Sequence, residues 1–302
     1  EIMSRWNRYL PDTTLVVVFL LASLGFADDG IRISADFEGG SANVISVDQE
    51  LATISIQPAT LPERGWPCWW FVRLDGLTIG QTITLNVSPS SAAYRDDLVL
   101  PAKWSLPDQA SISSHETDRS VWQQTEICQR QDDTARYQFA ATASTMWAAW
   151  GVPFLQSDAE QLLERVAQKL PAAERFELAR TRAGRPVNGI RVGDPATSQP
   201  RHFGVWVQAR QHAWEAGGSW VGQGFMEWLS GDDQEAEELR RLATVYYIPI
   251  MDVDSVTIGA GGKDAIPRDH NRDWSDAPVY PEVAAAQSKI RQINEAGHFD
   301  VF

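Results

Sequence analysis

A histidine and a glutamate stand three residues apart near the middle of this chain, as His212 and Glu215. A run of strand-forming residues, Phe203–Val207, precedes them, and a helical pattern follows. A neutral imidazole and a carboxylate at this spacing can bind one zinc ion from the same turn. A catalytic zinc site also keeps one coordination position open for water. The spacing therefore predicts a metal centre that activates water for hydrolysis.

A second group of polar residues follows further along the chain, where Asn271 and Arg272 are adjacent and Trp274 comes soon after. An amide and a guanidinium fork can hold a carboxylate through two hydrogen bonds. The pair is a candidate carboxylate-binding site. The alternative is that the two side chains only hold their own loop together.

Residues 28–150 show the pattern of a β-sandwich. Short segments alternate apolar and polar residues with a period of two, and clusters rich in glycine, proline and serine separate them: 31–35, 52–56, 82–87 and 137–141. Many short strands at this spacing are typical of an antiparallel sandwich. The aromatic group Trp66, Trp69, Trp70 and Phe71 could form a sugar-binding platform, but we favour a place in the sandwich core.

Residues 151–302 alternate helical and strand patterns. A capping box at 157–160 predicts a helix that carries Leu162, Leu163, Val166 and Leu170 on one face. The further expected elements are a hairpin of 176–181 and 187–192, strands at 203–208 and 245–251, helices at 220–229 and 281–296, and a last strand from 299. This order predicts an α/β domain with a mainly parallel or mixed sheet. Sites in such sheets form where loops leave the carboxyl ends of strands, which is where His212 stands.

With these motifs, the chain resembles the zinc carboxypeptidases, in the branch of the cytosolic carboxypeptidases and their bacterial relatives. The resemblance spans residues 31–302. It is carried by the His212/Glu215 pair, Ser219-Trp220-Val221, Ile248-Pro249, Asn271-Arg272-Asp273-Trp274, the lead-in 176–187 and the junction Trp150–Phe154. It implies an N-terminal sandwich followed by part of an α/β zinc carboxypeptidase domain.

The resemblance also implies an activity, the zinc-dependent release of C-terminal residues from peptides or proteins. His212 and Glu215 would be two of three zinc ligands, and Asn271 and Arg272 would bind the terminal carboxylate of the substrate. The family's third ligand and its general-base glutamate are expected beyond Phe302, so no general base is assigned within the chain. Lys263 lies nearest in register to an arginine of the family that polarises the scissile carbonyl, and we assign it to substrate binding.

Composition narrows the classes of partner. With 26 basic and 40 acidic residues the net charge is −14, which argues against nucleic acid as a partner because phosphate binding needs clustered Lys and Arg.

Arg5 and Arg8 precede an apolar run, Leu15–Phe26, that is too short for a membrane span. This pattern predicts a signal peptide at residues 1–27 and export to the periplasm or the extracellular medium.

Three points stay open at this stage. Cys68 and Cys128 could form a disulfide or remain thiols. A deacylase of small N-acyl amino acids would use the same metal pair. A non-catalytic binding module is the alternative from another class, and it would lead if the natural chain ended at Phe302, because two ligands alone hold zinc weakly.

Overall fold

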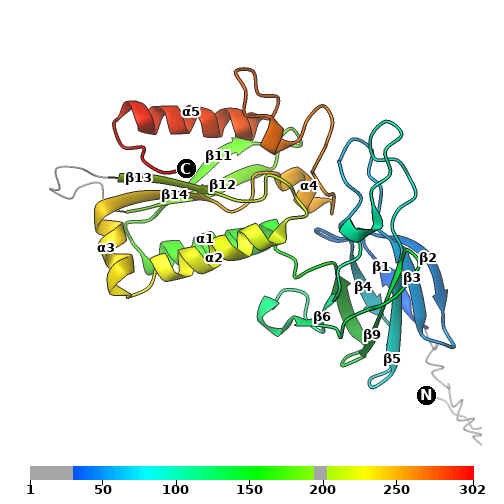
Figure 1. The fold of residues 1–302 in the computed structure, drawn as a ribbon. Coiled ribbons are helices and arrows are strands. Elements are labelled where there is room, and N and C mark those ends of the chain that lie inside the picture. Colours follow the sequence, from blue (N-terminus) through cyan, green and yellow to red (C-terminus); the bar gives the residue numbers. More distant parts are fainter. Residues whose placement is uncertain (1–29, 194–202) are drawn as a thin grey trace, which may run out of the picture.

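The computed structural model describes residues 30–193 and 203–302. The expected signal peptide, residues 1–27, lies outside the described residues. Figure 1 shows a β-sandwich beside an α/β domain whose sheet is covered by helices on both faces. Within the described residues, no helix combines the length and the apolar character that a membrane crossing requires.

The sandwich consists of two five-stranded sheets. One has the order β1 (Arg32–Ser34), β4 (Phe71–Asp75), β10 (Thr145–Ala149), β6 (Ser111–Ser113) and β7 (Gln123–Gln124). The other has the order β2 (Asn43–Asp48), β3 (Thr53–Gln57), β5 (Thr82–Val87), β9 (Thr134–Ala140) and β8 (Gln129–Gln131). The predicted sandwich is confirmed, with one departure from a purely antiparallel pattern. Strands β3 and β5 run parallel, because the chain between them crosses to the first sheet to form β4.

The aromatic run is divided between two cores. Trp69, Trp70 and Phe71 are buried, and the Trp70 indole N–H donates to the carbonyl of Ser105 at 2.9 Å. Trp70 lies in the sandwich core, whereas Trp69 and Phe71 belong to the cluster that includes the core of the α/β domain. The preference for core over a sugar platform is therefore right for all three, and the place in the sandwich core is right for Trp70. Trp66 is different, because it is only half-buried and its ring packs outside this core, against Trp104 and Trp214.

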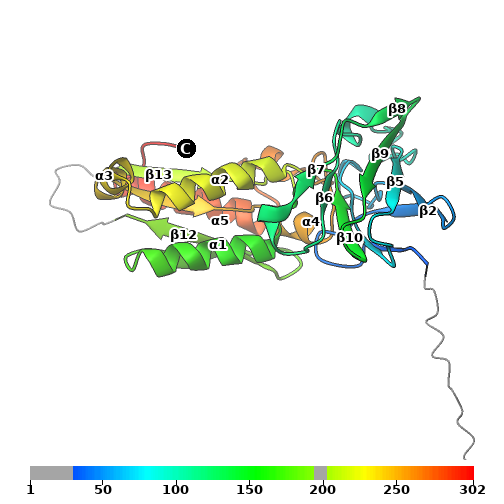
Figure 2. The same ribbon diagram turned by 90° about the horizontal axis from the view of Figure 1, so that it is seen from below.

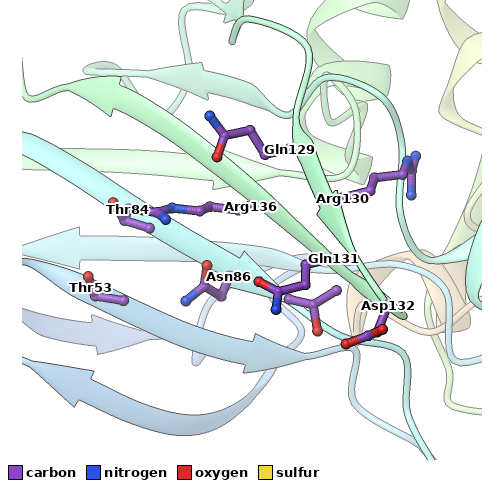
Figure 3. A pocket seen from close by; sticks show the side chains of 9 residues that line it. Thr53, Thr84, Asn86, Gln129, Arg130, Gln131, Asp132 and Arg136 are labelled. Carbon is purple, nitrogen blue, oxygen red and sulfur yellow. The ribbon is translucent and has the colours of Figure 1, made fainter.

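The outer face of the second sheet carries a polar hollow of about 810 Å³ (Figure 3). Hydroxyl, amide and charged side chains line it, and no aromatic ring is among them: Thr53, Thr84, Asn86, Gln129, Arg130, Gln131, Asp132, Thr134 and Arg136. Such a surface lacks the flat apolar rings on which a sugar would stack.

The α/β domain is built on a four-stranded mixed sheet. Its order is β11 (Glu174–Arg180), β12 (Pro186–Val192), β14 (Ala243–Ile248) and β13 (Phe203–Gln208), and only β13 and β14 are parallel. Helices α1 (Gln156–Lys169) and α2 (Ala216–Leu229) cover one face and α5 (Pro281–Glu295) the other (Figures 1 and 2). The expected mixed sheet is confirmed. The expected last strand appears only as a single parallel bridge between Val205 and Val301.

The start of α1 differs from the prediction. The capping box was expected at 157–160, but the helix begins one residue earlier, at Gln156. The carboxylate of Asp158 accepts the backbone N–H of Leu155 at 2.7 Å, and it also forms a buried ion pair with Arg119 from the 3-10 helix η2 (Arg119–Val121). Asp158 therefore closes the helix end and ties the two domains together, while Ser157 does not cap the helix.

The described residues also form the short helix α4 (Val253–Thr257) and the 3-10 helices η1 (Ala102–Trp104) and η3 (His270–Arg272). Cys68 is buried and Cys128 is partly exposed, and both are free thiols. The open question of a disulfide is therefore answered by two unpaired cysteines. Burial raises the pKa of the Cys68 thiol far above its ordinary value.

Helix α3 (Gln234–Leu242) depends on its N-cap. The Asp233 carboxylate accepts the N–H groups of Glu235 at 2.9 Å and Ala236 at 3.2 Å, which would otherwise lack partners. We expect Asp233→Ala to lower the free energy of unfolding by about 1 kcal/mol, measured by urea denaturation. Its exposed neighbour is the control, and Asp232→Ala should change stability by much less. Equal effects of the two variants would contradict the capping role.

Candidate metal centre

The loop that follows β13 is held in one conformation. Arg210 adopts a positive φ of 60°, an uncommon backbone state for a residue with a side chain. Its buried guanidinium donates to the carbonyl of Phe154 at 2.9 Å and to that of Ala213. The backbone of the loop is also paired with residues after β14, through Met251 N–H to Ala209 O and Asp252 N–H to Arg210 O, both at 3.0 Å. The segment of the loop that leads to His212 is therefore held in place by hydrogen bonds from its side chains and from its backbone.

His212 and Glu215 face one another. Nδ1 of His212 lies 3.0 Å from Oε1 of Glu215, and the imidazole is buried while the carboxylate is 46% exposed. A neutral imidazole nitrogen and an ionised carboxylate are both acceptors, so this approach needs either a proton or a cation between them. Ligand atoms in a tetrahedral zinc site at about 2.0–2.1 Å from the metal stand about 3.3 Å apart. The pair therefore fits one small dication, and its orientation agrees with the predicted shared site.

The second ring nitrogen of His212 faces another carboxylate. Nε2 lies 3.4 Å from Oδ1 of Asp269, a buried residue whose other carboxylate oxygen, Oδ2, accepts the N–H of Asp264 at 3.0 Å. Histidines that bind metals usually direct their free N–H at a carboxylate or carbonyl, which fixes the ring and its tautomer. Asp269 stands in that position. With Nε2 directed at Asp269, the lone pair of Nδ1 is left to bind a metal.

The pKa values of these groups agree with the geometry. Burial lowers the pKa of His212, but its contacts with Asp269 and Glu215 outweigh burial and raise it to about 9. Burial raises the pKa of Asp269, but the contacts with His212 and the Asp264 N–H bring it down to about 2. Two negative groups around one imidazole thus favour positive charge at this point, carried either by a proton or by a metal.

Two of the motifs that carry the resemblance support this loop. The indole N–H of Trp274 donates to Oε1 of Gln211, the residue before His212, at 2.5 Å. The hydroxyl of Ser219 on α2 donates to the carbonyl of Pro249 at 2.8 Å, which joins the start of the helix to the end of β14. Both contacts lie next to the segment that carries the two candidate ligands.

The predicted substrate-binding residues lie nearby. Asn271 and Arg272 are exposed on η3, two and three positions after Asp269, and the positive charge of Arg272 contributes to the low pKa of Asp269. Lys263 places Nζ 5.1 Å from the centre of the Trp66 ring and is half-buried. The structure thus leaves Asn271 and Arg272 accessible to a ligand and holds Lys263 against the sandwich. Their roles stay predictions.

Sequence reasoning missed Asp269, Arg210 and Trp214. Asp269 could have been anticipated, because a carboxylate partner is expected for any metal-binding histidine. The segment around Asn271 contains three aspartates that could serve: Asp264, Asp269 and Asp273. No sequence pattern points to Arg210 or Trp214. Within the described part of the chain, no group of three His, Cys, Asp or Glu side chains is placed to hold a metal, so the centre seen here consists of two candidate ligands.

Two family models match the chain. Residues 159–281 match the family model described as zinc carboxypeptidase, and residues 33–150 match that described as cytosolic carboxypeptidase N-terminal domain. A metallo-carboxypeptidase structure from Burkholderia cenocepacia aligns with a TM-score of 0.74 and 26% identity, over 87% of this chain and 68% of that one.

Among relatives, an uncharacterised protein of Zymomonas mobilis is 27% identical over 84% of this chain and 62% of its own length. Cytosolic carboxypeptidase 2 of Danio rerio is 30% identical over 45% of this chain and 20% of its own length. The chain thus spans less than two thirds of the length of these relatives. With both family models matched in order and the same fold in the solved structure, the chain carries a cytosolic carboxypeptidase N-terminal domain followed by a zinc carboxypeptidase domain.

Proposed function

We propose that this chain carries the zinc-binding and carboxylate-binding residues of a metallocarboxypeptidase that removes C-terminal residues from peptides or proteins. The observation that carries the proposal is the arrangement around His212, with Glu215 at one ring nitrogen and Asp269 at the other. His212 and Glu215 would hold the zinc ion. When bound, zinc polarises the scissile carbonyl and lowers the pKa of water to about 7.

The residues of this chain have separate tasks in that proposal. Asp269, whose Oδ1 lies 3.4 Å from Nε2 of His212, would keep the His212 ring in place. Asn271 and Arg272 bind the free carboxylate of the substrate, the guanidinium through two parallel hydrogen bonds, and so select a chain terminus over an internal bond. Lys263 supplies a positive charge at the edge of the site.

Two measurements test the proposal. Zinc binding by the chain is measured by calorimetry, and release of C-terminal residues is measured with the natural full-length protein on peptides with free or amidated C-termini. We expect hydrolysis only of the free acids, because an amide offers Arg272 no carboxylate. Faster hydrolysis of small N-acyl amino acids than of peptides would favour the deacylase, which no feature of the site supports at present.

Asp269 provides a test of the metal centre that does not remove a ligand. Asp269→Asn keeps the size of the side chain but replaces its charge, so the His212 ring loses its anionic partner. We expect zinc affinity to fall about 10- to 100-fold, measured by competition with a chelator. Asp276→Asn is a matched control, because Asp276 is an exposed aspartate in the same region of the chain. Unchanged affinity in Asp269→Asn would contradict the assigned role.

We also propose export, on the strength of the basic residues before the apolar run Leu15–Phe26. The word cytosolic in the names of relatives weighs against it. A fusion of residues 1–30 to a reporter that is active only outside the cytoplasm decides the matter. Reporter activity is the expected result, and a reporter that stays inactive would reject export.

A further inference from the structure

Trp214 lies between the two candidate ligands, and its ring is surrounded by tryptophans from the sandwich. The ring of Trp214 is 5.2 Å from Trp150 and 6.1 Å from Trp104, both edge to face, and 6.4 Å from Trp66 in a stacked arrangement. These three tryptophans lie within the region that matches the N-terminal domain model. The metal-binding loop therefore packs its central side chain against the other domain.

A second contact joins the same parts through the backbone. The sandwich loop 63–66 pairs with residues 262–266 by three hydrogen bonds at 2.9 Å: Gly262 N–H to Arg64 O, Trp66 N–H to Lys263 O and Ile266 N–H to Glu63 O. The indole N–H of Trp66 also donates to the Asp264 carboxylate at 2.8 Å. On the far side of this loop, Trp214 N–H donates to the carbonyl of Gly261 at 3.1 Å.

These contacts leave no space between the layers. A Cβ added to Gly65 would stand 2.1 Å from the Lys263 carbonyl, and one added to Gly261 would stand 2.1 Å from the Trp66 carbonyl. Gly262 has a φ of 79°, and a Cβ there would stand 2.7 Å from the N of Ala213, the residue after His212. The backbones of three loops are therefore stacked on one another: the sandwich loop 63–66, the loop 261–266 and the loop that carries His212 and Glu215. A shift in one of them must displace the next.

We infer that Trp66 is a positioning residue for the metal centre, acting through Trp214. Its ring supports one side of Trp214, and its N–H fixes the loop that holds the other side through Gly261. Because His212 and Glu215 flank Trp214, a displacement of the Trp214 backbone would change the distance between the two ligand atoms. A residue of the sandwich domain thus helps to set the geometry of the zinc site. This inference rests on the proposed function, and it extends that function to a residue outside the zinc carboxypeptidase domain.

The test is a comparison of zinc affinities by chelator competition in the full chain. We expect Trp66→Leu to weaken zinc binding about tenfold or more, the size of effect found when groups that orient a ligand are removed. Trp66→Phe keeps a ring against Trp214 and loses only the N–H, so it should recover part of the affinity. Trp228→Leu is the matched control, because Trp228 is a partly exposed tryptophan at the opposite end of α2. It should leave the affinity unchanged.

A double-mutant cycle tests the route of the effect. If Trp66 acts through Trp214, then Trp66→Leu should cost little further affinity in a Trp214→Leu background. The absorption spectrum of bound Co²⁺ should change in both single variants, which a loss of stability alone does not produce. Additive effects, or a Trp66→Leu variant that binds zinc like the wild type, would overturn the inference. If instead the natural full-length protein binds no zinc, it is the proposed function that fails.

Discussion

Replacing His212 by alanine is expected to abolish measurable zinc binding and to lower the release of C-terminal residues by roughly a thousandfold or more, because the metal supplies several kcal/mol of transition-state stabilisation. His212 contributes the one nitrogen ligand of the pair. Without it Glu215 remains as a partly exposed carboxylate that cannot retain the ion alone. Activity is followed with peptide substrates in the natural full-length protein, and zinc by calorimetry.

Two further variants separate ligand loss from damage to the fold. His212→Ala leaves the buried carboxylate of Asp269 without its partner, whereas the amide of His212→Gln can still donate a hydrogen bond to it. Both should lose zinc, but the second should keep more stability. His115 is an exposed histidine of the sandwich, and His115→Ala should behave like the wild type. A His212→Ala protein that retains zinc and activity would remove the basis of the metal assignment.

The second large effect is expected at His270, which is buried between two carboxylates. Its Nε2 lies 2.5 Å from Oε1 of Glu282 and its Nδ1 lies 3.6 Å from Oδ2 of Asp252, and all three side chains are almost fully buried. The ring also stacks on Tyr280 with centroids 3.9 Å apart. The sequence offers no motif for this histidine, and the structure shows that it is a buried structural residue.

His270→Leu should lower the free energy of unfolding by about 3–5 kcal/mol, because it leaves two carboxylates buried without a cation. Thermal or urea denaturation measures the loss. The matched variant is His270→Leu combined with Glu282→Leu, which removes one of the stranded charges and should recover part of the stability. If His270→Leu is as stable as the wild type, then the three groups do not form a coupled cluster.

The same cluster predicts a pH dependence. Burial lowers the pKa of His270, but the charge of Asp252 and the contact with Glu282 outweigh burial and raise it above its ordinary value of about 6.5. A raised pKa means that the folded state binds the proton more tightly than the unfolded state. The stabilisation is complete below about pH 6.5 and is lost as the pH rises through the raised pKa.

The stability difference between wild type and His270→Leu should therefore shrink at alkaline pH. Denaturation of both proteins in the same zinc-containing buffers, from pH 6 upwards, checks this. A difference that stays constant would show that His270 does not change its protonation in this range. Because only the difference is compared, other groups that titrate equally in both proteins cancel.

The sequence by itself determined the elements and the pair of candidate ligands. Period-two alternation specified the sandwich strands, and the strand Phe203–Gln208 followed by His212 and Glu215 placed a metal pair at the carboxyl end of a strand. These features are local, because strand periodicity and a three-residue spacing depend only on neighbours along the chain. The helix start at Gln156 was missed, since the sequence pattern placed the cap at Ser157, whereas Asp158, which is paired with Arg119, closes the helix end.

Only the tertiary structure decided which distant groups support the pair. Asp269 meets the far nitrogen of His212, and Trp66 packs on Trp214, although long stretches of chain separate the members of each pair. No periodicity encodes such contacts, because they depend on how the sandwich and the sheet dock and on how loops cross between them. Strand propensity fixes where a side chain points relative to its neighbours, but the packing of two domains fixes what it meets.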